Sequence, residues 1–160
     1  MPAETADPSK CGICKGIAAI KAGNSKDFIA ELPSSYLILG DAQYYRGYCI
    51  MFAKRHVTEM YLMSAEEARL MSSDMRLAAE AIAAVTRPWK MNYECLGNTE
   101  AHVHWHLFPR YENDEMRFGP VWLRAEAERK TALPADDRAR LMAALRKEIA
   151  VRFPDARISG

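Results

Sequence analysis

The chain has 160 residues, of which 49% are hydrophobic and 27% charged, and its formal net charge is +1. This length corresponds to about one domain, with enough residues to bury a core without disulfides. The near-neutral charge provides no electrostatic footprint for nucleic acid or for an anionic membrane. No apolar run approaches the roughly 18 residues that a membrane span requires. We therefore expect neither nucleic acid nor a membrane among its partners.

Low-complexity tracts, long linkers and internal repeats are absent from the sequence, which predicts a single domain over residues 10–153. Residues 1–9 are polar and acidic, do not resemble a signal peptide, and are predicted to be a disordered lead-in. Residues 154–160 are predicted to be a short tail. A cytoplasmic location follows, and in a reducing compartment the four cysteines are not expected to form a disulfide framework.

The first half of the domain predicts two strands and a helix. The apolar runs 36–39 and 48–52 are separated by a segment with turn residues at both ends, which is typical of a hairpin with a long connection. Ser64, followed three residues later by Glu67, forms the capping-box pattern that begins a helix. The helix is expected to stop before Pro88.

The second half repeats this order. Residues 90–96 and 101–108 predict two further strands, and residues 136–151 predict a last helix with one apolar face. Weaker patterns allow additional strands within 28–33 and at 121–123. Two strand pairs, each followed by a helix, predict an α+β fold around a central antiparallel sheet of about five strands.

Three of the four histidines fall within five residues, as His102, His104 and His106. Residues at i, i+2 and i+4 of a strand point to one face, so we expect the three imidazoles on one face and their apolar neighbours in the core. Like charges repel, which keeps such rings neutral near pH 7 and able to act as nucleophiles or metal ligands. The alternatives are three solvated surface histidines or a cluster that only binds metal.

The run His-Val-His-Trp-His-Leu-Phe-Pro-Arg, residues 102–110, resembles the H-φ-H-φ-H-φ-φ motif of the histidine triad (HIT) family. Residues 11 to roughly 122 fall within the resemblance, which implies a HIT-like fold with a long helix and a C-terminal helix, and a homodimer. The segments that match in family order are Leu39-Gly40-Asp41, Gly47-Tyr48, Lys54-Arg55-His56-Val57, Asn92 and Leu96-Gly97-Asn98.

The resemblance implies an enzyme that binds a small nucleotide, such as a phosphoramidate or a dinucleoside polyphosphate, and cleaves it at the α-phosphorus. His104 would attack and form a nucleotidyl-histidine intermediate, and His106 would contact the phosphate and assist the leaving group. His106 stands where the transferase branch has Gln, which resembles the hydrolase branches. The alternative is a nucleotide- or metal-binding regulatory protein with little turnover.

The resemblance also suggests residues that bind substrate. Asp41 falls where the family places an acidic or amide residue against the ribose hydroxyls, and Asn98 where it often has a phosphate contact; Asn92 is a weaker candidate. Asp41 and Asn98 could equally be turn residues. The sequence departs from the family pattern at residues 99–101, where Thr-Glu-Ala replaces the usual Gly-Gln-x-Val stretch.

Cys11 and Cys14 form a C-x-x-C pair, which is half of a typical zinc site. Some HIT proteins complete such a site with a histidine placed like His56 and with the first triad histidine. The resemblance thus implies a structural zinc bound by Cys11, Cys14, His56 and His102, and no organic cofactor. A redox C-x-x-C and two cysteines without a special role are the alternatives.

The helix predicted over residues 64–87 carries more apolar residues than one buried face requires. This excess suits the homodimer that the resemblance implies. A helix that is well covered within a monomer would show the same pattern.

Overall fold

The structure, a computed structural model, describes residues 7–158. Most of the predicted lead-in, residues 1–6, lies outside the described residues. Asp7 already belongs to an ordered turn, in which its carbonyl accepts a hydrogen bond from the amide of Lys10 at 3.0 Å. Among the described residues, no helix combines the length and the apolar character needed to cross a membrane.

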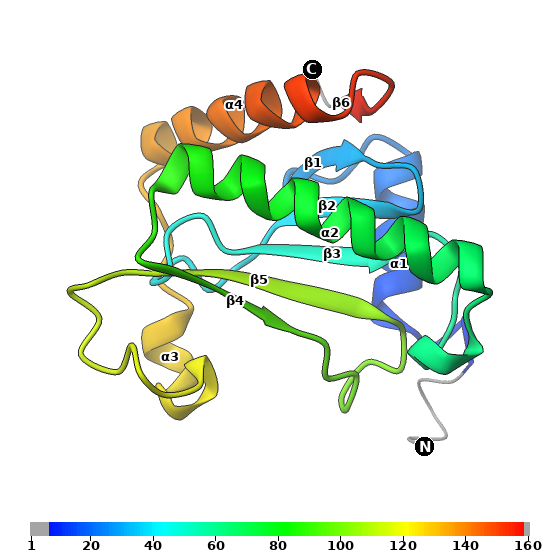
Figure 1. Cartoon of the computed structure of the whole chain (residues 1–160), viewed down its shortest axis with the longest axis horizontal. Coiled ribbons are helices and arrows are strands. Elements are labelled where there is room, and N and C mark those ends of the chain that lie inside the picture. The colour runs from blue at the N-terminus through cyan, green and yellow to red at the C-terminus, as the bar shows by residue number, and fades with distance from the viewer. Residues whose placement is uncertain (1–6, 159–160) are drawn as a thin grey trace.

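One antiparallel sheet of six strands organises the molecule, in the order β4-β5-β3-β2-β1-β6 (Figure 1). The α+β class with a central antiparallel sheet is confirmed, with one strand more than predicted. The extra strand falls in the predicted tail, where Arg157–Ile158 pairs with β1. The strands are β1 (Phe28–Glu31), β2 (Ser35–Leu39), β3 (Cys49–Ala53), β4 (Lys90–Glu94), β5 (His104–Arg110) and β6 (Arg157–Ile158).

The strand that carries the histidines differs in its limits from the prediction. β5 begins at His104, so His102 lies just before it, and the strand continues through Pro109 to Arg110, beyond the predicted end at residue 108. Pairing with β3 already ends at Leu107, so Pro109 faces only β4, where it lies opposite Met91. A proline is tolerated in a strand where one neighbour has already left the ladder.

Two long helices were predicted, and both are present. α2 (Ala65–Thr86) begins with a complete capping box between Ser64 and Glu67, and α4 (Ala135–Arg152) follows near the C-terminus. The pattern at 121–123 is not a strand: it forms a 3-10 turn, η2 (Val121–Leu123), because Val121 packs into a small core while its neighbours stay exposed. The remaining helical segments are η1 (Met60–Leu62), α1 (Gly12–Lys21) and α3 (Glu126–Arg129).

α2 and α4 pack against each other and cover one face of the sheet (Figure 1). Met71, Ala78 and Ile82 of α2 belong to the same buried cluster as Leu145 and Ile149 of α4. The apolar excess of α2 is therefore used within the chain, because two surfaces, the sheet and α4, need apolar partners.

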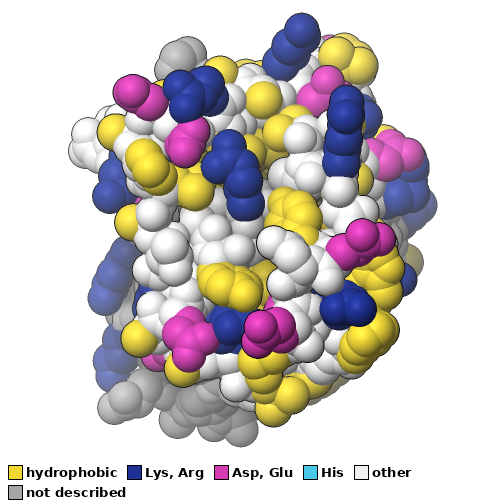
Figure 2. All heavy atoms as spheres, turned by 90° about the vertical axis from the view of Figure 1, so that its left-hand side faces the viewer, with side chains coloured by type: hydrophobic (Ala, Val, Ile, Leu, Met, Phe, Trp, Pro, Cys, Tyr) yellow, Lys and Arg dark blue, Asp and Glu magenta, His cyan; other side chains and the backbone are white. Residues whose placement is uncertain are grey.

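The other face of the sheet is covered in two separate places. α1 packs at one end through Ile17 and Ile20, against Phe28, Tyr36 and Phe52 of the strands. The segment after β5, residues 111–131, covers the other end and includes η2 and α3. Lys and Arg are interspersed with Asp and Glu over the side of the molecule that bears α3, which agrees with the near-neutral charge (Figure 2). A cavity lies between α1 and this segment.

Candidate functional site

β5 presents two of the three histidines on the face that α1 and residues 111–131 leave open. His104 lies opposite Phe52 of β3, and His106 lies opposite Ile50. Val103 and Leu107 belong to the core under α2 and α4, and Trp105 packs against it. The predicted alternation holds for His104 and His106, because residues two apart in a strand share a face, whereas His102 precedes β5 and lies in a separate cluster.

A chain of hydrogen bonds fixes the proton positions on these rings. His104 Nδ1 lies 2.6 Å from the carbonyl oxygen of His102. A carbonyl can only accept, so His104 Nδ1 carries the proton and its Nε2 carries the lone pair. His106 Nε2 lies 3.2 Å from that lone pair and therefore donates to it.

The other nitrogen of His106 then has only one possible role. Because a neutral imidazole carries one proton, His106 Nδ1 is an acceptor. The hydroxyl of Tyr48 lies 2.7 Å away and donates to it. The pKa of His106 is lowered to about 4, mainly by burial and further by His104 and Arg129, so the ring is neutral at physiological pH.

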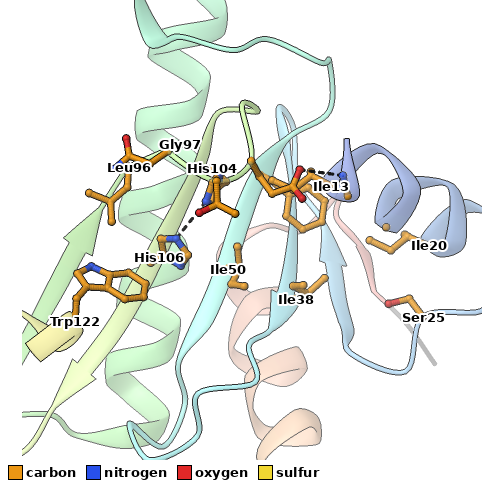
Figure 3. Close-up of a pocket in the computed structure, with 16 residues that line it drawn as sticks. Ile13, Ile20, Ser25, Ile38, Ile50, Leu96, Gly97, His104, His106 and Trp122 are labelled. Carbon is orange, nitrogen blue, oxygen red and sulfur yellow. Dashed lines mark hydrogen bonds between the residues drawn. The ribbon is translucent and has the colours of Figure 1, made fainter. Parts of the chain in front are cut away.

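A cavity of about 510 Å³ opens in front of the two histidines. His104 and His106 project into it between Trp122 of η2 and the isoleucines of α1 (Figure 3). Ile38, Ile50 and Phe52 form its apolar floor. Cavities of this size with a few convergent polar groups are typical of small-molecule sites. His104 Nε2, whose lone pair accepts from His106, thus borders a space large enough for a nucleotide-sized ligand.

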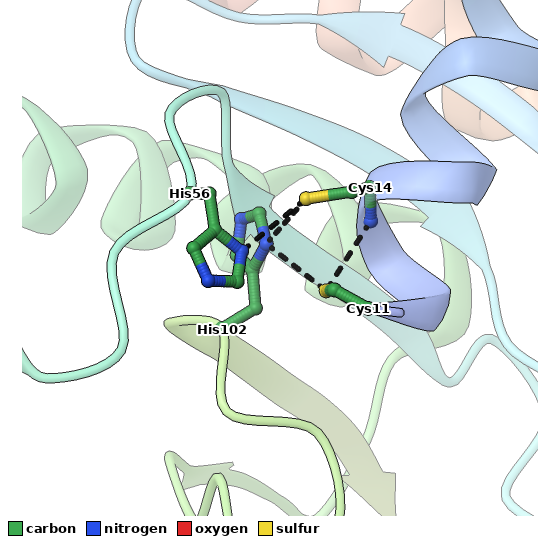
Figure 4. Close-up of side chains that lie close together, drawn as sticks. All are labelled: Cys11, Cys14, His56 and His102. Atoms are coloured by element: carbon green, nitrogen blue, oxygen red, sulfur yellow. Dashed lines mark hydrogen bonds between the residues drawn. The ribbon is translucent and has the colours of Figure 1, made fainter. Parts of the chain in front are cut away.

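His102 has a different environment from the other two histidines, in a cluster with Cys11, Cys14 and His56 (Figure 4). The four ligand atoms all lie within 4.8 Å of one another. His102 Nε2 donates to the carbonyl of Ala53 at 2.8 Å, which leaves its Nδ1 lone pair toward the thiols. An imidazole fixed in this way by a second partner is the usual arrangement of a metal ligand.

The distances in this cluster fit a tetrahedral zinc ion. His102 Nδ1 lies 3.6 Å from the sulfur of each cysteine, and His56 Nδ1 lies 3.3 Å from that of Cys14. Typical Zn–S and Zn–N bonds of about 2.3 and 2.0 Å place tetrahedral S and N ligands about 3.5 Å apart. The four predicted ligands are therefore together and spaced as a Cys₂His₂ site requires.

The thiols do not have the environment of a redox pair. Burial and the neighbouring Cys11 raise the pKa of Cys14 to about 11, whereas reactive C-x-x-C cysteines have a lowered pKa and react as thiolates. A raised pKa is compatible with metal binding, because a metal displaces the proton when it binds. The environment therefore favours a metal ligand over a redox cysteine.

The structure separates the three predicted substrate-binding residues. Asn98 lines the cavity with the two histidines. Asp41 lines a different hollow, where it pairs with Lys130 at 3.3 Å. Asn92 accepts a hydrogen bond at 2.8 Å from the buried guanidinium of Arg110. Of the three, only Asn98 shares the cavity with His104.

The structure adds three residues to the site that are not among the predicted catalytic, substrate-binding or metal-binding residues. Trp122 lines the cavity and packs edge-on against His106, with ring centroids 5.2 Å apart. Glu100, in the stretch that departs from the family pattern, accepts a hydrogen bond from the amide of Gly12 at the start of α1. Tyr48 orients His106. The helix α1, which forms one wall of the cavity, was not predicted either. It is the one missed feature with a sequence pattern, because Ile13, Ile17 and Ile20 recur at helical spacing.

Several solved structures share this fold. A histidine triad protein from Marinobacter aquaeolei VT8 has a TM-score of 0.70 at 19% identity, and the match covers 88% of this chain and 97% of that one. A HIT protein from Sinorhizobium meliloti 1021 has 0.66 at 21%, covering 77% and 90%. A Zn-bound HIT family protein from Mycobacterium smegmatis has 0.64 at 18%, covering 91% and 96%. At these identities the likeness establishes the fold alone.

Sequence comparison identifies the family. No curated protein matches the chain. The family model of the HIT domain matches residues 21–113, which is more than half of the chain and includes the three histidines of the motif. The chain therefore belongs to the HIT domain family.

Proposed function

We propose that this protein is a nucleotidyl hydrolase or transferase that acts at the α-phosphate of a small nucleotide, with His104 as the nucleophile. HIT family membership supports a nucleotide-binding or hydrolase-type function in general. The observation that carries the finer proposal is the tautomer of His104. Its Nδ1 proton is donated to the carbonyl of His102, so Nε2, which borders the cavity and accepts from His106, carries the lone pair that would attack once a substrate displaces this hydrogen bond.

The proposed reaction has two steps. His104 Nε2 attacks the α-phosphorus, so that an N–P bond forms while the bond to the leaving group breaks. The Nε2–H of neutral His106 donates a hydrogen bond to the leaving atom and stabilises the charge that develops there, and the proton that an amine leaving group needs comes from water. Water, or another acceptor hydroxyl, then attacks the phosphorus and releases its proton to solvent. The N–P bond breaks and the nucleoside monophosphate, or its ester, leaves. Asn98 is proposed to bind the phosphate; Asp41 and Asn92 stay weaker candidates because they lie outside the cavity.

We further propose a structural zinc bound by Cys11, Cys14, His56 and His102. Such an ion supplies folding free energy and no chemistry in the reaction. These ligands come from the start of α1, from the loop after β3 and from the residue just before β5. The site would therefore hold α1, a wall of the cavity, against the segment that carries His104.

Nucleoside monophosphate release tests the proposal. Wild type and His104→Ala are incubated with adenosine and guanosine phosphoramidates and dinucleoside polyphosphates, and products are separated by chromatography. Intact mass after rapid quenching detects the nucleotidyl-protein adduct. Trp105→Phe is the matched control, because Trp105 lies on the same strand and packs on the opposite face.

We expect release and adduct with wild type and with Trp105→Phe. For His104→Ala we expect no adduct and a rate lower by about 10⁴-fold or more, as for the loss of other covalent nucleophiles. If wild type and both variants bind nucleotide but none of them releases nucleoside monophosphate, the alternative of a regulatory binding protein with little turnover would replace this proposal.

A cytoplasmic homodimer is part of the proposal. The four free cysteines suit a reducing compartment. Because α4 already covers α2, a dimer would use β4, an edge of the sheet with exposed apolar side chains at Trp89, Tyr93 and Leu96. Sedimentation of wild type and of Tyr93→Lys would show whether this edge joins two copies.

A further inference from the structure

Tyr48 makes a contact to the reactive histidines that the sequence did not indicate. It directly precedes β3 and is 3% exposed, and its ring stacks on Phe108 with centroids 4.0 Å apart and planes 3° from parallel. Its carbonyl accepts from the amide of Gly40 at 3.0 Å and from the side chain of Gln43 at 2.9 Å. The ring has little freedom, so its hydroxyl is held 2.7 Å from His106 Nδ1.

Gly40, at the end of β2, makes room for this ring. A Cβ atom added at Gly40 would lie 2.2 Å from Tyr48 Cε1, well inside van der Waals contact. Any other residue at position 40 would push the tyrosine ring away from its place beside His106. The glycine and the tyrosine therefore act as a pair, and the pair decides where the hydroxyl lies.

We propose that Tyr48 is a positioning residue that selects the tautomer of His106: its hydroxyl donates to Nδ1 and so keeps the single ring proton on Nε2. Burial raises the pKa of Tyr48 far above its ordinary value, so the hydroxyl keeps its proton. A hydroxyl can also accept, but this one is buried and His106 Nδ1 is its one hydrogen-bond partner among the described residues, so the Nδ1–H tautomer of His106 would leave the hydroxyl proton without an acceptor. Without this donor, His106 can place its proton on Nδ1. In that tautomer the Nε2 lone pair would face the lone pair of His104 Nε2 at 3.2 Å, and His106 would have no N–H to offer to a leaving atom in the cavity.

The expected effect of Tyr48 on the reaction rate rests on the proposed function, whereas its effect on the tautomer of His106 does not depend on that function. In the proposed reaction His106 donates from Nε2, so only one of its two neutral tautomers is competent. A tyrosine that fixes the competent tautomer raises the rate of the chemical step. It leaves nucleotide binding nearly unchanged, because the Tyr48 side chain is not among the residues that line the cavity.

Tyr48→Phe tests the proposal, with Tyr45→Phe as the matched control. Tyr45 belongs to the same aromatic cluster as Tyr48 and Phe108, and within the described part of the chain its hydroxyl makes no hydrogen bond to a histidine, so its substitution removes a hydroxyl from the cluster without touching His106. Nitrogen-15 NMR of the four imidazoles reports which nitrogen of His106 is protonated. Steady-state kinetics on the substrate found above separates kcat from KM.

For wild type and Tyr45→Phe we expect His106 as the Nε2–H tautomer. For Tyr48→Phe we expect a mixture of tautomers and a kcat lower by about 10- to 100-fold, with KM changed by less than about threefold. An unchanged tautomer in folded Tyr48→Phe would overturn the proposal, as would equal losses of kcat in both variants.

Gly40→Ala provides a second route, since it moves the ring and keeps the hydroxyl. We expect the same mixture of tautomers in that variant, and the Nε2–H tautomer alone would contradict the proposal even if Tyr48→Phe failed to fold. If wild type has no turnover, the proposed function fails, whereas the NMR result still decides whether Tyr48 sets the tautomer.

Discussion

His102 and His104 are two residues apart, but their polar atoms are used differently. His102 is fully buried, and its Nε2, its Nδ1 and its carbonyl oxygen all have partners within the protein. His104 uses one nitrogen to bind the carbonyl of His102, and its other nitrogen faces a cavity. The polar atoms of His102 are therefore enclosed by the protein, whereas His104 Nε2 accepts from the neighbouring ring of His106 and borders the cavity. This difference agrees with the structural role proposed for His102 and the reactive role proposed for His104.

The comparison also shows how the two regions are connected. The carbonyl that orients His104 belongs to His102, whose side chain lies in the Cys₂His₂ cluster. The cluster includes Cys14 of α1, and α1 contributes Ile13 and Ile20 to the cavity wall. We call the cluster of Cys11, Cys14, His56 and His102 the metal end, and His104 with His106 the reactive end. We therefore expect substitutions at the metal end to alter stability and substrate binding, and substitutions at the reactive end to alter the chemical step.

The largest expected effect is the loss of the metal end. In Cys14→Ser, bound zinc should fall from about one per chain to near zero, because a serine hydroxyl is a poor zinc ligand. A loss on the order of 5 kcal/mol in the free energy of unfolding corresponds to a Tm lower by about 10–20 °C for a chain of this size. Metal analysis and thermal unfolding measure both effects. Cys95→Ser, at an exposed cysteine outside the cluster, is the control, and equal Tm changes would contradict a structural metal site.

The next effect concerns the reactive end at low pH. The folded pKa of His106 is about 4, below its unfolded value of about 6.5, so between these values the unfolded chain binds more protons. The free energy of unfolding should therefore fall as pH decreases from 6.5 toward 4, by up to about 2 kcal/mol at pH 5. Urea unfolding of wild type and His106→Gln, both with a chelator present, measures this contribution. Equal slopes against pH would show that His106 does not supply it.

A smaller effect tests whether the metal end supports the cavity. If zinc holds α1 in place, chelation should raise KM for the nucleotide by about tenfold and lower kcat much less, because His104 keeps its hydrogen bond to the backbone. Kinetics before and after chelation, at a temperature where circular dichroism shows the apo protein folded, provide the measurement. A fall in kcat at constant KM would mean that the two regions are coupled through the chemistry instead.

The smallest expected effect distinguishes the predicted substrate-binding residues. Asn98→Ala should raise KM by about threefold to tenfold, the value of one hydrogen bond to a ligand, because Asn98 lines the cavity. Asp41→Ala should change KM less, since that carboxylate pairs with Lys130 in another hollow. The opposite order in steady-state kinetics would show that Asp41 reaches the substrate after all.

Local patterns predicted most of the fold and part of the site. The capping box at Ser64, the apolar face of the last helix and the alternation around His104 and His106 are all present. Each depends on residues close together in the chain, whose geometry is set by the period of a helix or a strand. The extra strand β6 was missed because its two residues carry no periodic pattern and pair only through β1.

The sequence by itself determined that two histidines share a face, and through the family motif it indicated the four clustered metal ligands. Only the tertiary structure decided which nitrogen of each ring is available, because that depends on a carbonyl at His102 and a hydroxyl at Tyr48. It also separated Asn98 from Asp41, and it brought Trp122 beside His106. The contacts of His106 with Trp122 and Tyr48 join residues 16 and 58 positions apart, and no local period encodes them.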